Sequence, residues 1–319
     1  MNFHGDDFSK EKIYNLVVSD DLAGERLDVF LACKLDKTRS QVQILISDGK
    51  VSIEGQMKAK SSLIVRPQMV VSVRVQPKPV HDLVPEPINF DIFYADEDLI
   101  VLNKPSGLIV HPAPGHWSGT LVHGLLHRFP EIGECGVPER PGIVHRLDGS
   151  TSGLMVVSRN ERAHDLLSKA FQERRVQKEY LGLVWGSPKN MSGRVDLPIG
   201  RDPRNRYRMA VTPSGRRSVT GYKVLWRRKG YSLVRCSLMT GRTHQIRVHM
   251  KHLGCPIVGD QLYAPRRKMP FGLERVFLHS WMLAFSHPID GRPMRFRAPL
   301  PPELVDFLTK AFSRDPGRP

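Results

Sequence analysis

The chain has 319 residues, of which 40% are hydrophobic and 25% charged, and its formal net charge at pH 7 is +16. This composition excludes a disordered chain, and the length is enough for about two domains. The positive excess predicts an anionic partner, either a nucleic acid or an acidic membrane surface.

The cysteines and the N-terminus exclude further classes of protein. The four cysteines lie far apart in the sequence, at Cys33, Cys135, Cys236 and Cys255. Without a C-x-x-C pair they predict neither a disulfide framework nor a cysteine zinc site. The N-terminus carries Asp6 and Asp7 in place of a basic region, and no apolar run approaches the length of a membrane span. We therefore expect a soluble cytoplasmic protein that does not contact a membrane.

Residues 12–76 are predicted to form a small first domain. Apolar residues at helical spacing, such as Leu27 and Leu31, predict one helix, and a second short helix follows, with Ser40 as its cap. Alternating apolar residues then predict short strands around 51–53 and 69–75. Cations cluster on the helix pair, at Arg26, Lys34, Lys37 and Arg39.

Three short segments of this first domain are informative, namely Gly24-Glu25-Arg26-Leu27-Asp28, Thr38-Arg39-Ser40 and Gly49-Lys50-Val51. With these segments the domain resembles the S4-type (alpha-L) RNA-binding domain, a helix pair with short strands found in ribosomal and RNA-modifying proteins. The resemblance implies RNA contacts through Arg26, Lys37 and Arg39. A small packing domain is the alternative, because short basic helices are common.

Residues 77–88 are predicted to form a semi-rigid linker, because four prolines interrupt any strand or helix there. The second domain spans 89–312. Its predicted strands are 92–94, 100–103, 108–111, 154–158, 179–184, 233–237 and 277–285, and its predicted helices are 120–129, 161–174, 244–253 and 302–312. Strands outnumber helices and do not alternate regularly with them. This pattern favours an α+β domain with a mixed, largely antiparallel central sheet.

The positive charge is concentrated in residues 194–235, which hold twelve Lys or Arg against two Asp or Glu. Aromatic residues interleave with these cations, at Tyr207, Tyr222, Trp226 and Tyr231. The mixture suits contact with RNA phosphates beside base stacking. The alternative is a solvated basic surface.

Sequence motifs of several common enzyme classes are absent. The chain has no G-x-x-x-x-G-K-[ST], no G-x-G-x-x-G after a strand, no G-x-S-x-G and no H-E-x-x-H. Nucleotide hydrolases, dehydrogenases, α/β-hydrolases and zincins are therefore disfavoured. His244, His249 and His252 share one predicted helix, but no carboxylate or cysteine nearby in the sequence completes a metal shell, so we expect no metal.

Asp148 is the first candidate catalytic residue. Residues 142–157 place two apolar strands around a polar loop in which Asp148 is the single carboxylate. Such loops carry function more often than stability. The alternative is a turn carboxylate that accepts hydrogen bonds from nearby amides.

Arg247 and Tyr180 are the other two candidates. On the predicted helix 244–253, His244, Arg247 and Lys251 share one face. Arg247 would keep a pocket carboxylate ionised, because an opposite charge offsets desolvation; otherwise it is a surface arginine. In the predicted strand 179–184, Tyr180 would present its phenol as a proton carrier, or serve as a core tyrosine.

In this order, the three segments resemble the RluA/RluD family of pseudouridine synthases, which isomerise uridine to its carbon-linked form in RNA. Further matching residues are Asn103-Lys104-Pro105-Ser106-Gly107-Leu108, His111-Pro112, Pro256-Ile257-Val258-Gly259-Asp260 and Leu278-His279-Ser280. The resemblance covers about residues 92–299 and implies the pseudouridine synthase fold. With the S4-type domain it favours large-subunit (23S) ribosomal RNA as the substrate, with transfer RNA as the other possibility.

The resemblance also implies the residue roles. Asp148 is the catalytic aspartate, Tyr180 the proton-handling tyrosine and Arg247 the partner of Asp148. Arg146 helps to hold the target nucleotide out of its stack. Gly149-Ser150 stands where many members have Lys-Asp, a departure that bears on target identity more than on activity.

This chemistry needs no redox cofactor, metal or ATP, and we expect none. One carboxylate can act as a nucleophile on the sugar, as a nucleophile on the ring, or as a base on a sugar hydroxyl, and the sequence leaves these three open. A non-catalytic RNA-binding or ribosome-assembly factor is the alternative function, based on the charge and the first domain alone. We expect a monomer.

Overall fold

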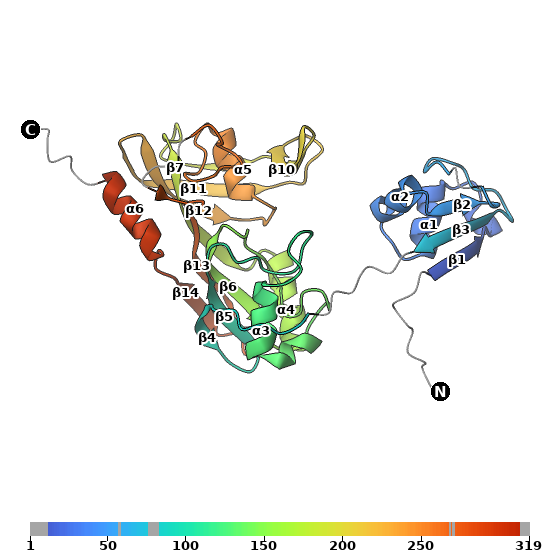
Figure 1. The fold of residues 1–319 in the computed structure, drawn as a ribbon, viewed down its shortest axis with the longest axis horizontal. Coiled ribbons are helices and arrows are strands. Elements are labelled where there is room, and N and C mark those ends of the chain that lie inside the picture. Colours follow the sequence, from blue (N-terminus) through green and yellow to red (C-terminus); the bar gives the residue numbers. More distant parts are fainter. Residues whose placement is uncertain (1–11, 57–58, 76–82, 268, 270–271, 313–319) are drawn as a thin grey trace, which may run out of the picture. The chain divides into compact units, whose positions relative to one another are not determined.

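The computed structural model describes residues 12–56, 59–75, 83–267, 269 and 272–312. The chain divides into two compact units, Met1–His81 and Asp82–Pro319 (Figure 1). Pro77 and Pro79 of the predicted linker, and the acidic N-terminus, lie outside the described residues. No helix in the described part of the chain is long and apolar enough to span a membrane.

The first unit is a three-stranded antiparallel sheet with a helix pair. Its strands follow the order β1-β3-β2, with β1 at Lys12–Val17, β2 at Val51–Ile53 and β3 at Val70–Val75. A 3-10 turn, η1 (Asp20–Leu22), precedes helices α1 (Leu27–Lys34) and α2 (Arg39–Ser47). Buried Leu27, Phe30 and Val42 from the helices pack with Val71 and Val73 from β3 to form its core.

Helix α2 begins before the predicted cap. Thr38 is its N-cap residue: the Thr38 hydroxyl accepts a hydrogen bond from the Gln41 amide, and the Gln41 side chain accepts one from the Thr38 amide. Ser40 therefore lies inside the first turn and is not the cap. Two neighbouring residues can both cap a helix, and the reciprocal bond with Gln41 favours Thr38.

The second unit contains a nine-stranded sheet in the order β4-β5-β6-β13-β7-β12-β11-β8, with β14 paired to β13, and the sheet is mixed and largely antiparallel, as predicted. Strands β6 and β13 run parallel, and the other described pairings are antiparallel. The strands are β4 (Asp91–Ala95), β5 (Leu99–Lys104), β6 (Ser152–Ser158), β7 (Gln177–Trp185), β8 (Ser192–Asp196), β11 (Val219–Arg228), β12 (Tyr231–Leu238), β13 (Leu278–Ser286) and β14 (Pro293–Arg297).

Helices and a small ribbon complete this unit (Figure 1). They are α3 (Leu121–Arg128), η2 (Pro130–Glu134), α4 (Glu161–Gln172), α5 (Gln245–His252), α6 (Pro302–Phe312) and a two-stranded ribbon of β9 (Ile199–Asp202) and β10 (Asn205–Val211). The basic stretch 194–235 thus folds into strands β8 to β12. Figure 1 shows α3 and α4 beside the β4–β6 part of the sheet and α5 beside the β7–β12 part.

The predicted strand 108–111 was wrong, because this segment is not part of the sheet. Its carbonyl groups bind the start of helix α3 instead: the Leu121 amide donates to the Ile109 carbonyl at 2.8 Å and the Val122 amide to the Val110 carbonyl at 3.0 Å. These are helix N-terminal amides that lack partners within their own helix. The segment therefore anchors α3 and continues no strand.

Strand β6 lies between two hydrophobic clusters. Met155 and Val157 belong to the cluster that contains α3 and α6, whereas Leu154 and Val156 belong to the cluster that contains α4. This alternation follows from the two-residue period of a strand, and every residue of β6 is buried. The loop that precedes β6 is thereby joined to a strand that is packed on both faces.

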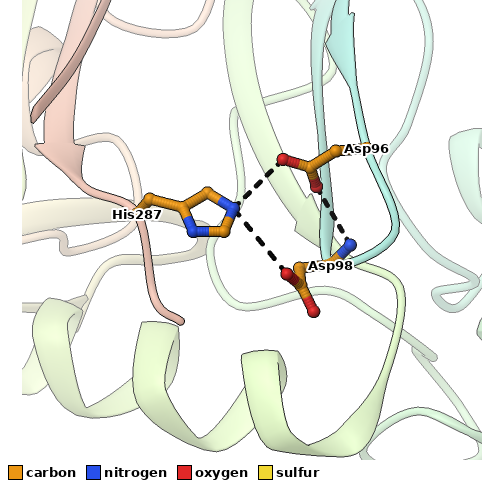
Figure 2. A group of neighbouring side chains, drawn as sticks. All are labelled: Asp96, Asp98 and His287. Carbon is orange, nitrogen blue, oxygen red and sulfur yellow. Dashed lines mark hydrogen bonds and ion pairs between the residues drawn. The ribbon is translucent and has the colours of Figure 1, made fainter. Parts of the chain in front are cut away.

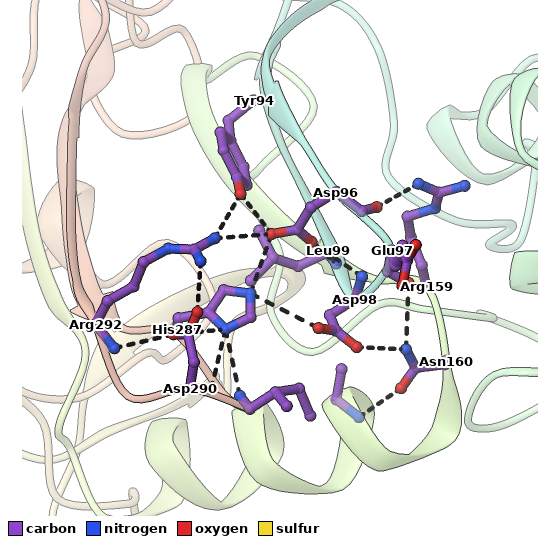
Figure 3. A network of polar contacts seen from close by, with 12 residues as sticks. Tyr94, Asp96, Glu97, Asp98, Leu99, Arg159, Asn160, His287, Asp290 and Arg292 are labelled. Atoms are coloured by element: carbon purple, nitrogen blue, oxygen red, sulfur yellow. Dashed lines mark hydrogen bonds and ion pairs between the residues drawn. The ribbon is translucent and has the colours of Figure 1, made fainter.

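A polar network joins the β4–β5 turn, the β13–β14 turn and the start of α4 (Figure 3). His287 Nε2 lies 3.0 Å from Asp96 Oδ2, and the Arg292 guanidinium donates to the same carboxylate at 3.2 Å. Asn160, the N-cap of α4, donates to Asp98 at 2.8 Å. The network therefore fastens three segments that are far apart in the sequence.

Within this network Asp96, Asp98 and His287 place one ligand-type atom each within 4.8 Å of one another (Figure 2). The trio has the residue types of a metal site. However, Arg292 already brings a positive charge to Asp96, and the other ring nitrogen of His287 lies 3.1 Å from Asp290. These contacts explain why the three side chains lie together: they hold the β4–β5 and β13–β14 turns in place.

Candidate active site

A pocket of about 420 Å³ brings the predicted catalytic residues together. Most of its lining comes from the loop before β6, the end of α4, the start of β7 and the segment from the end of β12 into α5, with Leu278 at the start of β13. Arg146, Asp148, Tyr180 and Arg247 all line this pocket. Because these residues are spread over about a hundred positions of sequence, their meeting is a property of the tertiary fold.

The segment that follows β5, up to Leu108, holds the loop that carries Asp148 in place. The Gly107 amide donates to the Gly149 carbonyl at 2.8 Å, and the Ser106 hydroxyl donates to the Ser150 carbonyl at 2.9 Å. The Thr151 amide donates to the Asp148 carbonyl at 3.0 Å. With its backbone fixed, Asp148 keeps a side chain that is 19% exposed toward the pocket.

Lys104 is a buried part of the same support. Its ammonium donates to the carbonyls of Pro105 and Leu108 and, at 3.1 Å, to that of Gly149. Burial lowers the pKa of Lys104 to about 7. The three carbonyl acceptors offset part of the cost of removing the cation from water.

Arg247 connects two carboxylates. Its Nη1 lies 3.3 Å from Asp148 Oδ2, and its Nε and Nη2 donate to the Asp260 carboxylate at 2.8 and 2.9 Å. The Arg247 side chain is only 6% exposed, so it is not the surface arginine of the alternative interpretation. The bidentate bond to Asp260 fixes the plane of the guanidinium and leaves Nη1 directed at Asp148.

His244 is the second group beside Asp148. Its Nε2 lies 4.0 Å from Asp148 Oδ2, and its Nδ1 lies 2.9 Å from the Tyr263 hydroxyl. Burial lowers the pKa of His244, which leaves the ring mainly neutral at pH 7. His249 is engaged elsewhere, between the Thr220 hydroxyl and the Leu197 carbonyl, so these two histidines do not face a common point.

Tyr180 is buried beside the pocket on β7. Burial raises the pKa of Tyr180 above its usual range; the Ser280 hydroxyl offsets part of this rise and the charge of Asp148 adds to it. The side chain is therefore a neutral phenol at pH 7, near a carboxylate that an arginine holds in place. In this arrangement the carboxylate can act as a nucleophile at carbon, and the phenol can transfer a proton.

The predicted RNA-binding residues fall into two groups. Arg146 is exposed at the pocket, two residues before Asp148. In the first unit, Arg26 and Arg39 both bind the fully buried carboxylate of Asp28, at 3.0 and 3.1 Å. Their side chains are still about half exposed, so the ion pairs leave surface for other contacts. Lys37, which is partly buried, makes no ion pair among the described residues.

No role was predicted from the sequence for four residues of the site, namely Lys104, Lys178, Asp260 and Tyr263. Lys104 and Asp260 stood in matched motifs, but the motifs do not say what these side chains contact. The position of Lys178 could have been predicted, because it precedes Tyr180 by two residues and strand alternation puts both side chains on one face. Tyr263 had none.

Comparison with known proteins identifies both units. The family model for RNA pseudouridylate synthase matches residues 98–252, and the S4 domain model matches residues 25–71. The chain is 41% identical over 295 residues to the RNA pseudouridine synthase YlyB of Bacillus subtilis. The alignment covers 92% of this chain and 96% of that protein. It is 42% identical over 311 residues to ribosomal large subunit pseudouridine synthase D of Neisseria meningitidis, covering 94% of this chain and 82% of that protein.

A solved structure agrees with these relatives. The structure of human RNA pseudouridylate synthase domain containing 1 aligns with a TM-score of 0.54 and 30% identity, over 71% of this chain and 95% of the human chain. Sequence and fold thus give the same answer over most of the molecule. The chain belongs to the RluA/RluD family of RNA pseudouridine synthases, isomerases that act on RNA, and carries an N-terminal S4 domain.

Proposed function

We propose that this synthase converts uridine to pseudouridine in large-subunit (23S) ribosomal RNA, with Asp148 as the catalytic carboxylate. One observation carries the proposal: Asp148 Oδ2 lies 3.3 Å from Nη1 of Arg247, in the pocket that Tyr180 also lines. The ribosomal target is supported by a relative at 42% identity whose name is ribosomal large subunit pseudouridine synthase D. Transfer RNA is the competing substrate.

The isomerisation breaks the bond between the uracil nitrogen and the ribose, turns the freed uracil within the pocket and joins a ring carbon to the same sugar carbon. The proton on that ring carbon then leaves, and the ring nitrogen that was freed from the ribose takes one up. Bonds broken and formed balance without an oxidant, reductant or nucleotide, so we propose that no cofactor takes part. Asp148 serves as a nucleophile at the sugar or at the ring, or as a base toward a sugar hydroxyl.

Arg247 and Tyr180 support this carboxylate in different ways. Arg247, fixed by Asp260, orients Asp148 and keeps it ionised, since an opposite charge at 3.3 Å favours the charged form. Tyr180 enters as a neutral hydroxyl, because burial raises its pKa. In that form it passes a proton between the uracil ring and a neighbouring acceptor.

Arg146 acts on the RNA rather than on the reacting atoms. A uridine in stacked RNA must leave its stack to reach Asp148, which costs a few kcal/mol. The exposed side chain of Arg146, two residues from Asp148, is placed to fill the gap that the nucleotide leaves. Family membership decides against the non-catalytic RNA-binding factor, which rested on charge and the first domain alone.

The test of the substrate uses two unmodified RNAs, a large-subunit ribosomal transcript and a transfer RNA pool. After incubation with the protein, chemical mapping of pseudouridine should find defined uridines in the ribosomal transcript and none in the transfer RNA. Modification of transfer RNA alone would refute the ribosomal target. We also propose that the protein acts in the cytoplasm, as its ribosomal substrate would require, and that it acts as a monomer.

A further inference from the structure

Lys178 is a pocket cation to which the proposed mechanism gives no role. It precedes Tyr180 by two residues on β7, and both side chains line the pocket. The Lys178 ammonium lies 5.1 Å from the centre of the Phe171 ring. Phe171 is in turn stacked on His145, with ring centres 4.6 Å apart, and His145 accepts a hydrogen bond from the Val156 amide of β6. The platform under Lys178 is therefore tied to the central sheet.

Lys178 lacks the partners that the two buried cations of this region, Lys104 and Arg247, have. Within the described part of the chain it meets no carboxylate and no hydrogen-bond acceptor, only the face of Phe171. Lys104 donates to three carbonyl oxygens, and Arg247 binds two carboxylates. Burial lowers the pKa of Lys178 to about 8, so the side chain is still mainly charged at pH 7. Lys178 is only partly buried, so a ligand that enters the pocket can reach its ammonium and supply an acceptor.

Further positive charge surrounds the same pocket. Arg242 lines it, and burial together with the charges of Arg216 and Arg174 lowers the pKa of Arg242. Like charges held together in this way create a positive potential that an incoming anion relieves. The uracil and ribose of the substrate are neutral, so the anion that RNA brings into the pocket is a backbone phosphodiester.

We propose that Lys178 binds the phosphodiester group next to the everted uridine. The inference rests on the proposed function, because its ligand is RNA with a flipped nucleotide. The phosphate supplies the acceptor that Lys178 lacks, and β7 then fixes that phosphate two residues from Tyr180. Lys178 is thus a substrate-positioning residue that sets the register of the nucleotide in the pocket.

The test replaces single phosphodiesters of a substrate oligonucleotide by neutral methylphosphonates, on the 5′ or the 3′ side of the target uridine. Binding is measured with the Asp148→Asn protein, so that turnover does not disturb it. We expect one of the two replacements to weaken binding about tenfold, the size of one lost charged hydrogen bond. In the Lys178→Met, Asp148→Asn protein the unmodified RNA binds about tenfold more weakly, and the methylphosphonate has no further effect.

Two variants serve as controls. Lys178→Arg retains the charge and should retain the methylphosphonate effect. Lys189→Met removes one exposed charge from the turn after β7 and should leave the effect in full. The slope of log Kd against log salt should fall by roughly 0.7 with Lys178→Met, as for one phosphate contact to a single strand.

The inference is overturned if Lys178→Met binds RNA as tightly as its parent, or if it keeps the full methylphosphonate penalty. Lys178→Gln replaces Lys178→Met in the same comparison if thermal melting shows that the methionine variant is unfolded. An Asp148→Asn protein that still forms pseudouridine would refute the role of Asp148 but would leave this binding result intact, so the two failures are distinguishable.

Discussion

Asp260 shows how one residue outside the reacting atoms sets the geometry of the pocket. Its carboxylate is fully buried and accepts two hydrogen bonds from Arg247 and one from the Tyr263 amide at 3.1 Å. The Tyr263 ring also lies under the Arg247 guanidinium, 5.0 Å from its carbon. Arg247 therefore has one free direction, toward Asp148.

We expect Asp260→Asn to lower the single-turnover rate at saturating RNA about a hundredfold while RNA affinity changes little. The amide removes one charge from a buried ion pair and turns one acceptor into a donor, which faces Arg247 unfavourably. Loss of a partner from such a pair also costs about 3 kcal/mol of unfolding free energy. The rate, the RNA affinity and thermal melting are measured together. A folded Asp260→Asn protein with the wild-type rate would show that the orientation of Arg247 does not matter.

At this scale the sequence predicted which side chains meet but not how each is held. The ordered motifs named Asp148, Tyr180 and Arg247, and all three line one pocket. The bidentate bond to Asp260 could not be predicted, because it depends on how the chain after α5 turns back. Arg26 and Arg39 were predicted to contact RNA, but their ion pairs with Asp28 were not predicted. The sequence does not reveal that the Asp28 carboxylate is buried.

Among the elements, the long periodic helices and the buried strands were predicted well, and errors arose where backbone groups had two possible partners. The segment 108–111 alternates like a strand, but its carbonyls bind the first amides of α3. Strands β1, β8, β9, β10, β11 and β14 were not predicted. They are short or rich in polar residues, and their pairing partners rather than their own patterns define them.

The polar network of the β4–β5 and β13–β14 turns gives a prediction at this scale. His287→Ala should lower the unfolding free energy of the second unit by about 2 kcal/mol, because it leaves Asp96 and Asp98 without the buried imidazole between them. Activity per folded molecule should not change, since none of these residues lines the pocket.

A chelator provides the matched measurement. Because Arg292 and His287 already contact these carboxylates, EDTA should leave the melting temperature of the wild-type protein unchanged. A fall in melting temperature with EDTA, restored by a divalent cation, would instead identify Asp96, Asp98 and His287 as ligands of a structural metal.

For the molecule as a whole, the distribution of charge agrees with the chemistry of an RNA substrate. The basic stretch 194–235 forms β8 to β12, and the chain continues from β12 directly into Arg242 and Arg247 of the pocket. Some of these cations are paired locally, since Arg194 and Arg217 both bind Asp196. The positive charge that remains unpaired attracts polyanions and orients them on the surface. The choice of one uridine depends instead on contacts within the pocket.

We propose that the Asp148 carboxylate performs the isomerisation, and Asp148→Asn removes that carboxylate with little other change. The amide has nearly the same size, and Arg247 keeps its bond to Asp260, so the fold and RNA binding should persist. Pseudouridine formed in a single turnover on ribosomal RNA is measured beside the RNA dissociation constant. The structure predicts a rate lower by a factor on the order of a thousand or more, with nearly unchanged binding. An Asp148→Asn variant that forms pseudouridine at close to the wild-type rate would show that Asp148 is not the catalytic carboxylate.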